Sequence, residues 1–355
     1  MRQEETEDEE ERTNGQHNQE RVISKDPGPQ DYWVIVTITE SGSVATERLP
    51  LPVLPMRHSV GVCMGGKVYV WVSGNTHSLG RWGAWERCML WELSLDTREW
   101  TDLTDRDIET WPCPTSVLDP PPLTCTPLMV QVSDRELLLL SVPEPEDLGC
   151  VPDTVQGWIY DTQTRVFKAI APTDIPNHWD ECDKWTCTAE RVGSSVHVFG
   201  SEFGGDYTPV FHKELILPTN DNPQGHWIDH KCIEGTVGNH VQDIGGGLLL
   251  RFTEREVDCY DTVRCLWSRP LLDLDPDGNT CIDKDMVEGY ATYTSCRIDA
   301  ETVFLLCTTE DWWMLSRFDG KEIVKGFLLT VDQEALREHC TVTPTYTFGE
   351  QMAKW

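Results

Sequence analysis

A short acidic run contains the side chains best suited to hold a cation. Asp273, Asp275 and Asp277 precede Gly278, which reproduces the D-x-D-x-D-G opening of a calcium loop. Alternate carboxylates around a glycine turn can present several oxygens to one hard cation. However, Lys284 stands where such a loop supplies a bidentate glutamate, and the sequence predicts no flanking helices. We interpret the run as a solvated acidic turn, keep calcium as the alternative ligand, and predict no other cofactor.

Residues 74–88 have the composition of a binding loop. This segment reads GNTHSLGRWGAWERC, and its glycines would let it adapt to a partner. Tryptophan and arginine are the residue types most enriched at protein-binding hot spots. The competing interpretation is that the tryptophans pack within their own loops, and the sequence weighs the two equally. The predicted partner-binding residues, from this loop and two further connections, are Arg81, Trp82, Trp85, Arg87, Trp111 and Trp179.

Motifs for catalysis are missing from the sequence. The chain has neither the G-x-S-x-G motif of a serine hydrolase nor a glycine loop ahead of a helix that would hold phosphate. His226, His230 and Cys232, with Cys182 and Cys187 upstream, could supply zinc ligands, but neither C-x₂-C nor the usual paired spacing is present. His226 flanks an anchor tryptophan, so we interpret the group as packing residues. The sequence therefore predicts that the protein is not an enzyme.

The charge of the chain limits the classes of partner. There are 29 basic and 60 acidic side chains, which gives a net charge of −31 at pH 7. Such a protein would repel phosphate backbones, so nucleic acid is excluded and a basic protein or peptide is favoured. No apolar run approaches the ~20 residues of a membrane span, and no secretory signal is recognisable. We expect a cytoplasmic monomer with reduced cysteines and no membrane partner.

Residues 1–31 differ in composition from the rest of the chain. They are acidic and polar, and they end in the turn-forming sequence Asp26-Pro27-Gly28-Pro29. A segment with so little apolar surface cannot offset the entropy lost on ordering. The sequence predicts a disordered acidic tail, and an acidic tail that docks a partner is the alternative.

The remaining residues contain a decaying repeat of four short strands. Its best copy begins with HSVGVCM and KVYVWVSG, which are separated by Gly65-Gly66, and ends with MLWELSL and EWTDLT. Alternation of valine and aromatic residues predicts strands, and Gly-Gly predicts a tight hairpin. The turn before the fourth strand contains Asp96-Thr97, which recurs as Asp161-Thr162 and Asp261-Thr262. Each copy is an antiparallel meander that needs neighbours to bury its two faces.

This repeat resembles the kelch repeat, through MRHSVGVCMGGKVYVWVSG, LSLDTREWTDL, YDTQTRVF and YDTVRCLW. The resemblance covers residues 32–355 and implies an all-β propeller with four-stranded antiparallel blades. The glycine pair that ends the family's second strand is largely lost in this chain. Five whole blades are expected at about 56–104, 122–172, 185–232, 235–273 and 289–330.

A sixth blade is predicted from the two ends of the repeat region. Residues 32–52 resemble a third and fourth strand, whereas residues 338–355 resemble a first and second strand. Pairing these two segments would complete a composite blade and close the ring, which removes exposed sheet edges. The sequence thus predicts a six-bladed propeller.

Together these observations predict a non-catalytic scaffold that binds a protein or peptide on the loop-bearing face of the propeller. Long inserts all fall in connections expected on one face, and loops on a rigid scaffold commonly carry binding. The alternative is a propeller enzyme, of the galactose oxidase type or another, with its active site at the mouth of the central channel.

Overall fold

The structure is a computed structural model, and it describes residues 32–38, 44–50, 58–74, 87–103, 125–143, 154–174, 184–203, 210–232, 238–253, 256–273, 290–310 and 323–344. The chain divides into an N-terminal unit, Met1–Pro55, and a C-terminal unit, Met56–Trp355. No helix among the described residues is long and apolar enough to cross a membrane.

The N-terminal unit contains one antiparallel hairpin. Strand β1 (Tyr32–Ile38) pairs with β2 (Val44–Pro50), in a register that runs from Tyr32 opposite Pro50 to Ile38 opposite Val44. The alternation of apolar residues in this segment predicts this pair of strands.

The described residues of the C-terminal unit form five antiparallel sheets. The first sheet consists of β3 (His58–Met64), β4 (Lys67–Gly74), β5 (Arg87–Ser94) and β6 (Trp100–Asp102). The second consists of β7 (Cys125–Gln131), β8 (Glu136–Pro143), β9 (Thr154–Asp161), β10 (Val166–Ala169) and β11 (Thr173–Asp174). The third consists of β12 (Lys184–Val192), β13 (Ser195–Phe203), β14 (Val210–Ile216) and β15 (His226–His230). The fourth consists of β16 (Gly238–Gly245), β17 (Leu248–Thr253), β18 (Glu256–Asp261), β19 (Leu266–Ser268), β20 (Leu272–Asp273) and β24 (Cys340–Val342). The fifth consists of β21 (Tyr290–Arg297), β22 (Thr302–Glu310) and β23 (Ile323–Thr330).

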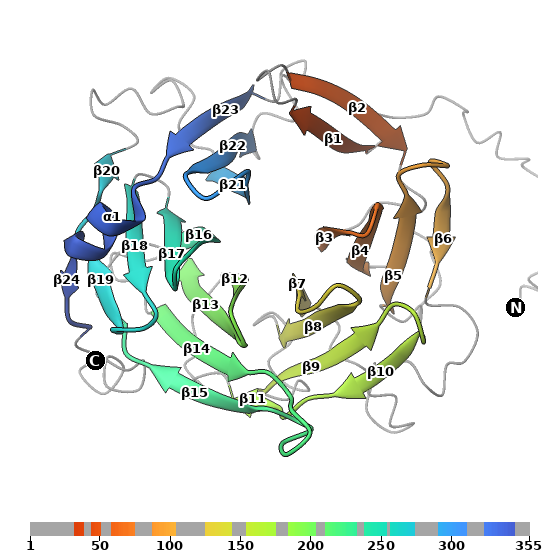
Figure 1. The fold of residues 1–355 in the computed structure, drawn as a ribbon. Coiled ribbons are helices and arrows are strands. Elements are labelled where there is room, and N and C mark those ends of the chain that lie inside the picture. The colour runs from red at the N-terminus through yellow and green to blue at the C-terminus, as the bar shows by residue number, and fades with distance from the viewer. Residues whose placement is uncertain are drawn as a thin grey trace, which may run out of the picture. The chain divides into compact units, whose positions relative to one another are not determined.

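The first strands of these five sheets follow one another around a common axis. Strand β3 contacts β7, β7 contacts β12, β12 contacts β16, and β16 contacts β21. We call these five the inner strands, and Figure 1 shows the later strands of each sheet lying progressively farther out. This arrangement is a β-propeller, as predicted, with five blades among the described residues.

The prediction of six blades is wrong, and so is the predicted position of the C-terminal strands. Cys340 lies opposite Ser268 and Val342 opposite Trp267, so β24 extends the outer edge of the fourth sheet. The composite blade predicted that this segment would pair with the N-terminal hairpin. Residues 345–355, its second half, lie outside the described part of the chain, and closure of a ring remains a prediction.

A short helix directs the chain to this outer edge. Helix α1 (Gln333–His339) begins at Asp332, whose carboxylate accepts hydrogen bonds from the backbone N–H groups of Glu334 and Ala335. Gln333 Nε2 donates to the carbonyl of Ile244 at 2.7 Å and to that of Ala300 at 3.1 Å. The helix is therefore held against the turns of both the fourth and the fifth sheet.

The fifth sheet also differs from the predicted repeat. Strand β23 pairs directly with β22, from Thr302 opposite Thr330 to Thr309 opposite Ile323. A whole four-stranded blade is expected at about 289–330, in which residues 323–330 would be the fourth strand. Among the described residues this segment is instead the third strand of its sheet.

The turns before the outer strands share one backbone structure, although the sequence repeat aligns different residues in them. Asp161 Oδ1 accepts from the N–H groups of Gln163 and Thr164, and Asp261 Oδ1 accepts from the two corresponding amides. In the first sheet Ser94, not Asp96, occupies this position, because Ser94 ends β5 as the two aspartates end β9 and β18. In all three turns the residue four positions later has a positive φ: Arg98 (61°), Arg165 (58°) and Cys265 (53°).

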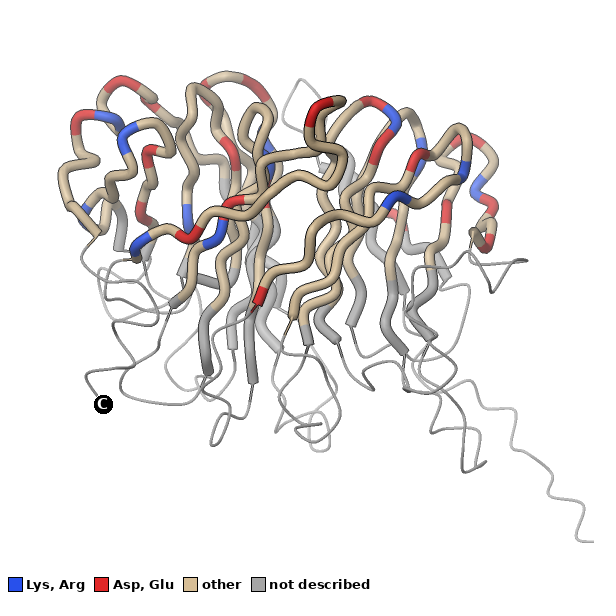
Figure 2. The backbone as a smooth tube through the Cα atoms, turned by 90° about the horizontal axis from the view of Figure 1, so that it is seen from below, with Lys and Arg blue, Asp and Glu red and all other residues tan. Residues whose placement is uncertain are grey.

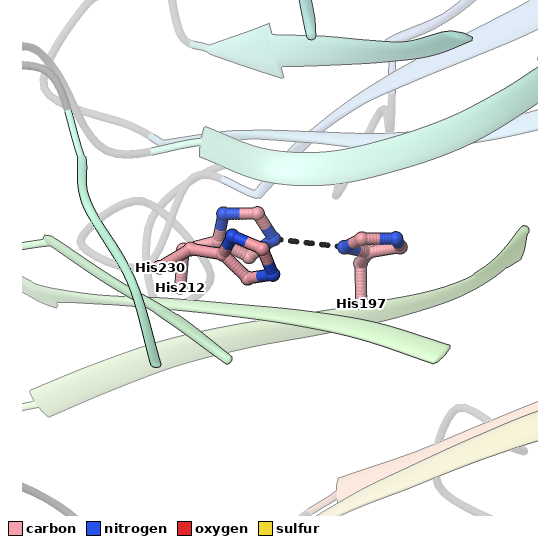
Figure 3. Close-up of side chains that lie close together, drawn as sticks. All are labelled: His197, His212 and His230. Atoms are coloured by element: carbon pink, nitrogen blue, oxygen red, sulfur yellow. Dashed lines mark hydrogen bonds between the residues drawn. The ribbon is translucent and has the colours of Figure 1, made fainter. Parts of the chain in front are cut away.

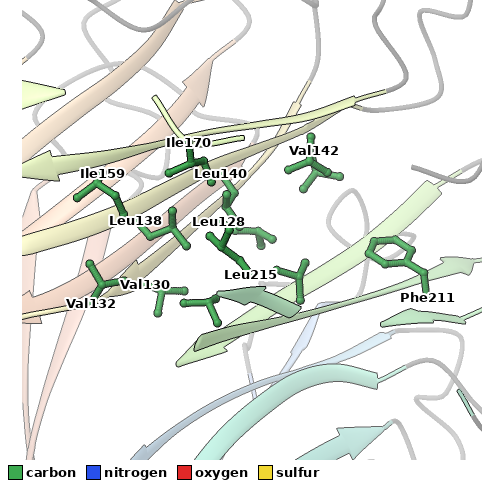
Figure 4. Packing of buried hydrophobic residues seen from close by; sticks show 13 residues of the cluster. Leu128, Val130, Val132, Leu138, Leu140, Val142, Ile159, Ile170, Phe211 and Leu215 are labelled. Carbon is green, nitrogen blue, oxygen red and sulfur yellow. The ribbon is translucent and has the colours of Figure 1, made fainter. Parts of the chain in front are cut away.

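Among the described residues the largest apolar core lies between the second and third sheets (Figure 4). Leu138, Leu140 and Val142 of β8 meet Val196 and Val198 of β13 there. All five side chains are fully buried or nearly so. Apolar burial of this kind stabilises by about 25 cal/mol per Å². Packing between sheets therefore supplies the burial that a single meander lacks.

Replacing Gln333 by Ala tests whether the C-terminal segment belongs to the fourth sheet. The change removes two hydrogen bonds to the carbonyls of Ile244 and Ala300, and it should lower the free energy of unfolding by about 1–2 kcal/mol. Amide exchange of Val342 should also accelerate. Glu338→Ala, at an exposed position of the same helix, is the control and should change neither quantity. Equal effects of the two changes would contradict this docking.

Candidate functional site

Most of the site residues predicted from the sequence lie outside the described part of the chain. Residues with no described placement are Arg81, Trp82, Trp85, Trp111, Trp179, Asp275 and Asp277. Arg87 is the first residue of β5 and pairs with Gly74, and Asp273 is in β20 opposite Glu256. The binding loop and the acidic loop therefore remain predictions.

The described residues contain a line of polar side chains across three neighbouring inner strands. Glu190 lies on β12, His240 and Gln242 lie on β16, and Ser295 lies on β21. Gln242 Nε2 lies 3.4 Å from Glu190 Oε1, and Ser295 Oγ donates to Gln242 Oε1 at 3.0 Å. His240 Nε2 lies 2.7 Å from Ser295 Oγ. We call this group, with Asp243, the inner-strand site.

Two carboxylates of the inner-strand site are neighbours with unusual acidities. Burial raises the pKa of Glu190 from 4.5 to about 8. The hydrogen bond from the Asp243 backbone amide lowers this pKa, whereas the negative charge of Asp243 raises it further. Burial also raises the pKa of Asp243, against the hydrogen bond from Gly245 and the charge of Arg297. At pH 7 Glu190 is therefore mainly protonated beside a second carboxyl group.

The histidine of the site is neutral at pH 7. Burial lowers the pKa of His240 to about 4. The backbone N–H of Ser295 donates to His240 Nε2 at 3.1 Å, which requires that nitrogen to carry no proton. Although Ser295 and His240 have the proximity of a nucleophile and its base, a base with a pKa of about 4 is a weak one at pH 7. The acidic pair is the better-suited reactive group.

The two carboxylates lie near the tight-turn end of the inner strands. Glu190 is three residues before Gly193, and Asp243 is two residues before Gly245, and both glycines have positive φ. Figure 2 shows acidic and basic residues side by side along the edge formed by these turns. Glu190 and Asp243 are only partly buried, so the site is open to solvent on this side.

A second polar cluster lies farther out on the third sheet. His197, His212 and His230 come from β13, β14 and β15, and the cross-strand register brings them to one face (Figure 3). His197 and His212 are each 1% exposed, and their Nδ1 and Nε2 atoms are 2.9 Å apart. Burial lowers the pKa of His197 to about 4 and that of His212 well below 6.5. One ring nitrogen from each of the three histidines lies within 4.8 Å of the others.

Sequence reasoning missed both groups. His230 was recognised as a ligand type, but its partners are His197 and His212 rather than the exposed His226 or the buried Cys232. The histidines are 15 and 18 residues apart, so only the strand register reveals them. The one sequence signal was a polar residue at alternate positions of otherwise apolar strands, as in SVHVF.

Comparison with known proteins shows similarity in fold. No family model and no curated protein matches the sequence. A Trypanosoma rangeli sialidase in complex with sialic acid is 10% identical with a TM-score of 0.43, and the match covers 83% of this chain and 49% of that chain. An α-L-arabinanase mutant from Cellvibrio cellulosa is 11% identical with a TM-score of 0.42, covering 82% and 99%. An α-L-arabinofuranosidase from Podospora anserina is 13% identical with a TM-score of 0.41, covering 78% and 91%.

These neighbours correct the functional prediction made from the sequence. All three have the names of enzymes, whereas the sequence predicts a non-catalytic scaffold that binds a protein or peptide. These names contradict that prediction and the prediction that the protein is not an enzyme. At such low identity the likeness shows the fold alone. This chain spans about half the length of the sialidase. The kelch type of the repeat remains a prediction.

Replacing Glu190 by Gln tests the acidity of the inner-strand site through stability. Between pH 4.5 and 8 the folded protein holds a proton on Glu190 that the unfolded chain has lost, so stability falls as pH rises through this range. The depressed histidine pKa values act oppositely, but only below about pH 6.5. From pH 6.5 to 8 the wild type should therefore lose about 1–2 kcal/mol of unfolding free energy, and Glu190→Gln should flatten this loss. Identical pH profiles from denaturant titrations of the two proteins would contradict the raised pKa.

Proposed function

We propose that the protein is an enzyme that uses general acid–base catalysis at the inner-strand site. The observation that supports this most is the juxtaposition of Glu190 with Asp243 on adjacent inner strands, held by Gln242. A carboxylic acid that keeps its proton at pH 7 can protonate a leaving group, and a neighbouring carboxylate can serve as base or nucleophile.

Glycosides are the substrate class that fits this pair. Glycosidic bonds are cleaved by two carboxyl groups, one of which must be protonated when the substrate binds. In the proposed reaction the proton of Glu190 passes to the glycosidic oxygen as the C–O bond breaks. Asp243 then accepts a proton from the water whose oxygen forms the new bond to the sugar. The neighbours in fold include enzymes named for sialic acid and arabinose substrates, and these sugars define the first panel to assay.

The neighbouring polar groups would position the acid rather than react. Gln242 Nε2 also donates to the carbonyl of Asp243 at 3.1 Å, so one amide links the two acidic residues. Arg297 lies against Gly245, where an added Cβ would stand 2.6 Å from its guanidinium. Its positive charge favours the ionised form of Asp243, which is the form that a base requires.

Activity should depend on Glu190 in a way that identifies an acid. On aryl glycosides of sialic acid and arabinose, Glu190→Gln should lower kcat by about 10²- to 10⁴-fold. The loss should be greater for substrates with poor leaving groups, because these need protonation most. Wild-type activity should fall as pH rises through about 8, since Glu190 then loses its proton.

Glu301→Gln, at an exposed position on the turn before β22, provides the matched control and should retain full activity. Circular dichroism should show that both variants are folded. Absence of turnover on the whole glycoside panel would refute the substrate class. Full activity of Glu190→Gln would refute the catalytic role of this acid.

A further inference from the structure

The three histidines of the third sheet point toward one another from adjacent strands. His212 lies directly opposite His230 across the β14–β15 pair, and their rings stack with centroids 4.5 Å apart. His197 approaches from β13 with its Nδ1 2.9 Å from His212 Nε2 (Figure 3). The backbone ladder fixes all three positions, so the nitrogens converge without any contribution from a loop.

His212 has a buried nitrogen that nothing in the described part of the chain satisfies. Its Nδ1 is enclosed and lacks a hydrogen-bond partner, as do the nearby Tyr260 hydroxyl and Trp267 Nε1. An unsatisfied buried polar group typically costs about 1–3 kcal/mol. Of these atoms His212 Nδ1 belongs to the three-imidazole cluster, where a bound ligand would supply the missing interaction.

Glu214 is hydrogen-bonded to one of the three rings and lies near a second. His230 Nε2 lies 2.7 Å from Glu214 Oε2, and His197 Nε2 lies 3.9 Å from Glu214 Oε1. A carboxylate that accepts the outer N–H of a histidine fixes its tautomer and leaves the other nitrogen free to coordinate. For His230 this leaves Nδ1 as the free nitrogen, whereas His197 Nδ1 contacts His212 Nε2.

The surroundings favour a bound cation with a closed shell of ligands. Phe199 stacks on His212 with ring centroids 4.1 Å apart, and Tyr260 meets the same ring edge-on at 4.9 Å. Arg251, whose charge would repel a cation, is paired with Asp258, whose Oδ1 accepts from Arg251 Nε at 3.0 Å. The His230 side chain is 14% exposed and provides a route of entry.

We propose that His197, His212 and His230 bind one divalent transition-metal ion between the third and fourth sheets, with Glu214 as orienting group or fourth ligand. Imidazole nitrogens select zinc and its neighbours over calcium or magnesium, which prefer oxygen. Tetrahedral zinc holds its nitrogens about 3.3 Å apart, so the 4.8 Å cluster must contract slightly on binding. The site stabilises the packing of two sheets and is independent of the proposed inner-strand chemistry.

The test uses untagged full-length protein, stripped with chelator and then dialysed against zinc. We expect one ion per chain by mass spectrometry of the metal, and a Tm that rises with zinc until the site is saturated. His212→Phe keeps an aromatic ring between Phe199 and His230 but removes both nitrogens, so it should abolish binding. Glu214→Gln should weaken the affinity by about 10- to 100-fold.

His226→Ala is the matched control, because this histidine lies on β15 as well but is exposed, and it should bind zinc as the wild type does. If His212→Phe does not fold, His230→Asn at the partly exposed position gives the same comparison. Binding that survives either change, or wild-type protein that takes up no zinc, would show the triad to be a hydrogen-bonded element of the core. Loss of zinc without loss of glycosidase activity would confirm that the two sites are separate.

Discussion

The structure of the C-terminal unit depends on the packing of one sheet against the next. A four-stranded meander has two faces, and in this architecture only a neighbouring sheet can bury them. Between the second and third sheets this need is met by aliphatic side chains such as Leu138, Leu140 and Val198. Between the third and fourth sheets it is met differently, because alternate positions of β13 and β14 place Ser195, His197, His212 and Glu214 on the facing surface.

That polar face explains why the perturbed acidities occur where they do. Burial disfavours charge, so it lowers the pKa of His197 and His212 and raises that of Glu190 at the inner end of the same sheet. His197 and His212 are hydrogen-bonded to each other on this face. One sheet face thus carries both the proposed acid at its inner edge and the proposed metal ligands farther out.

The sequence predicts turns and strands correctly where neighbouring residues alone determine the local structure. Gly65-Gly66 has positive φ at both residues, as its hairpin requires, and the valine alternation of β4 gave its strand correctly. It failed where a pattern has more than one structural solution. Asp96 resembles Asp161 in sequence, yet Ser94 ends β5 two residues earlier and occupies the equivalent position. The histidine triad could not be predicted, because its members meet only through the register of three strands.

The inner-strand acid is hard to explain as a structural residue. A partly buried carboxyl group whose pKa is raised makes folding less favourable as the pH rises to neutral and above. Glutamine would keep a similar shape and hydrogen-bonding capacity without this loss of stability. Gln242, on the neighbouring strand, is already such an uncharged hydrogen-bonding residue. Groups that reduce stability in this way are concentrated at functional sites, where their altered acidity is what the chemistry requires. The acid at position 190 is therefore better explained by proton transfer than by packing.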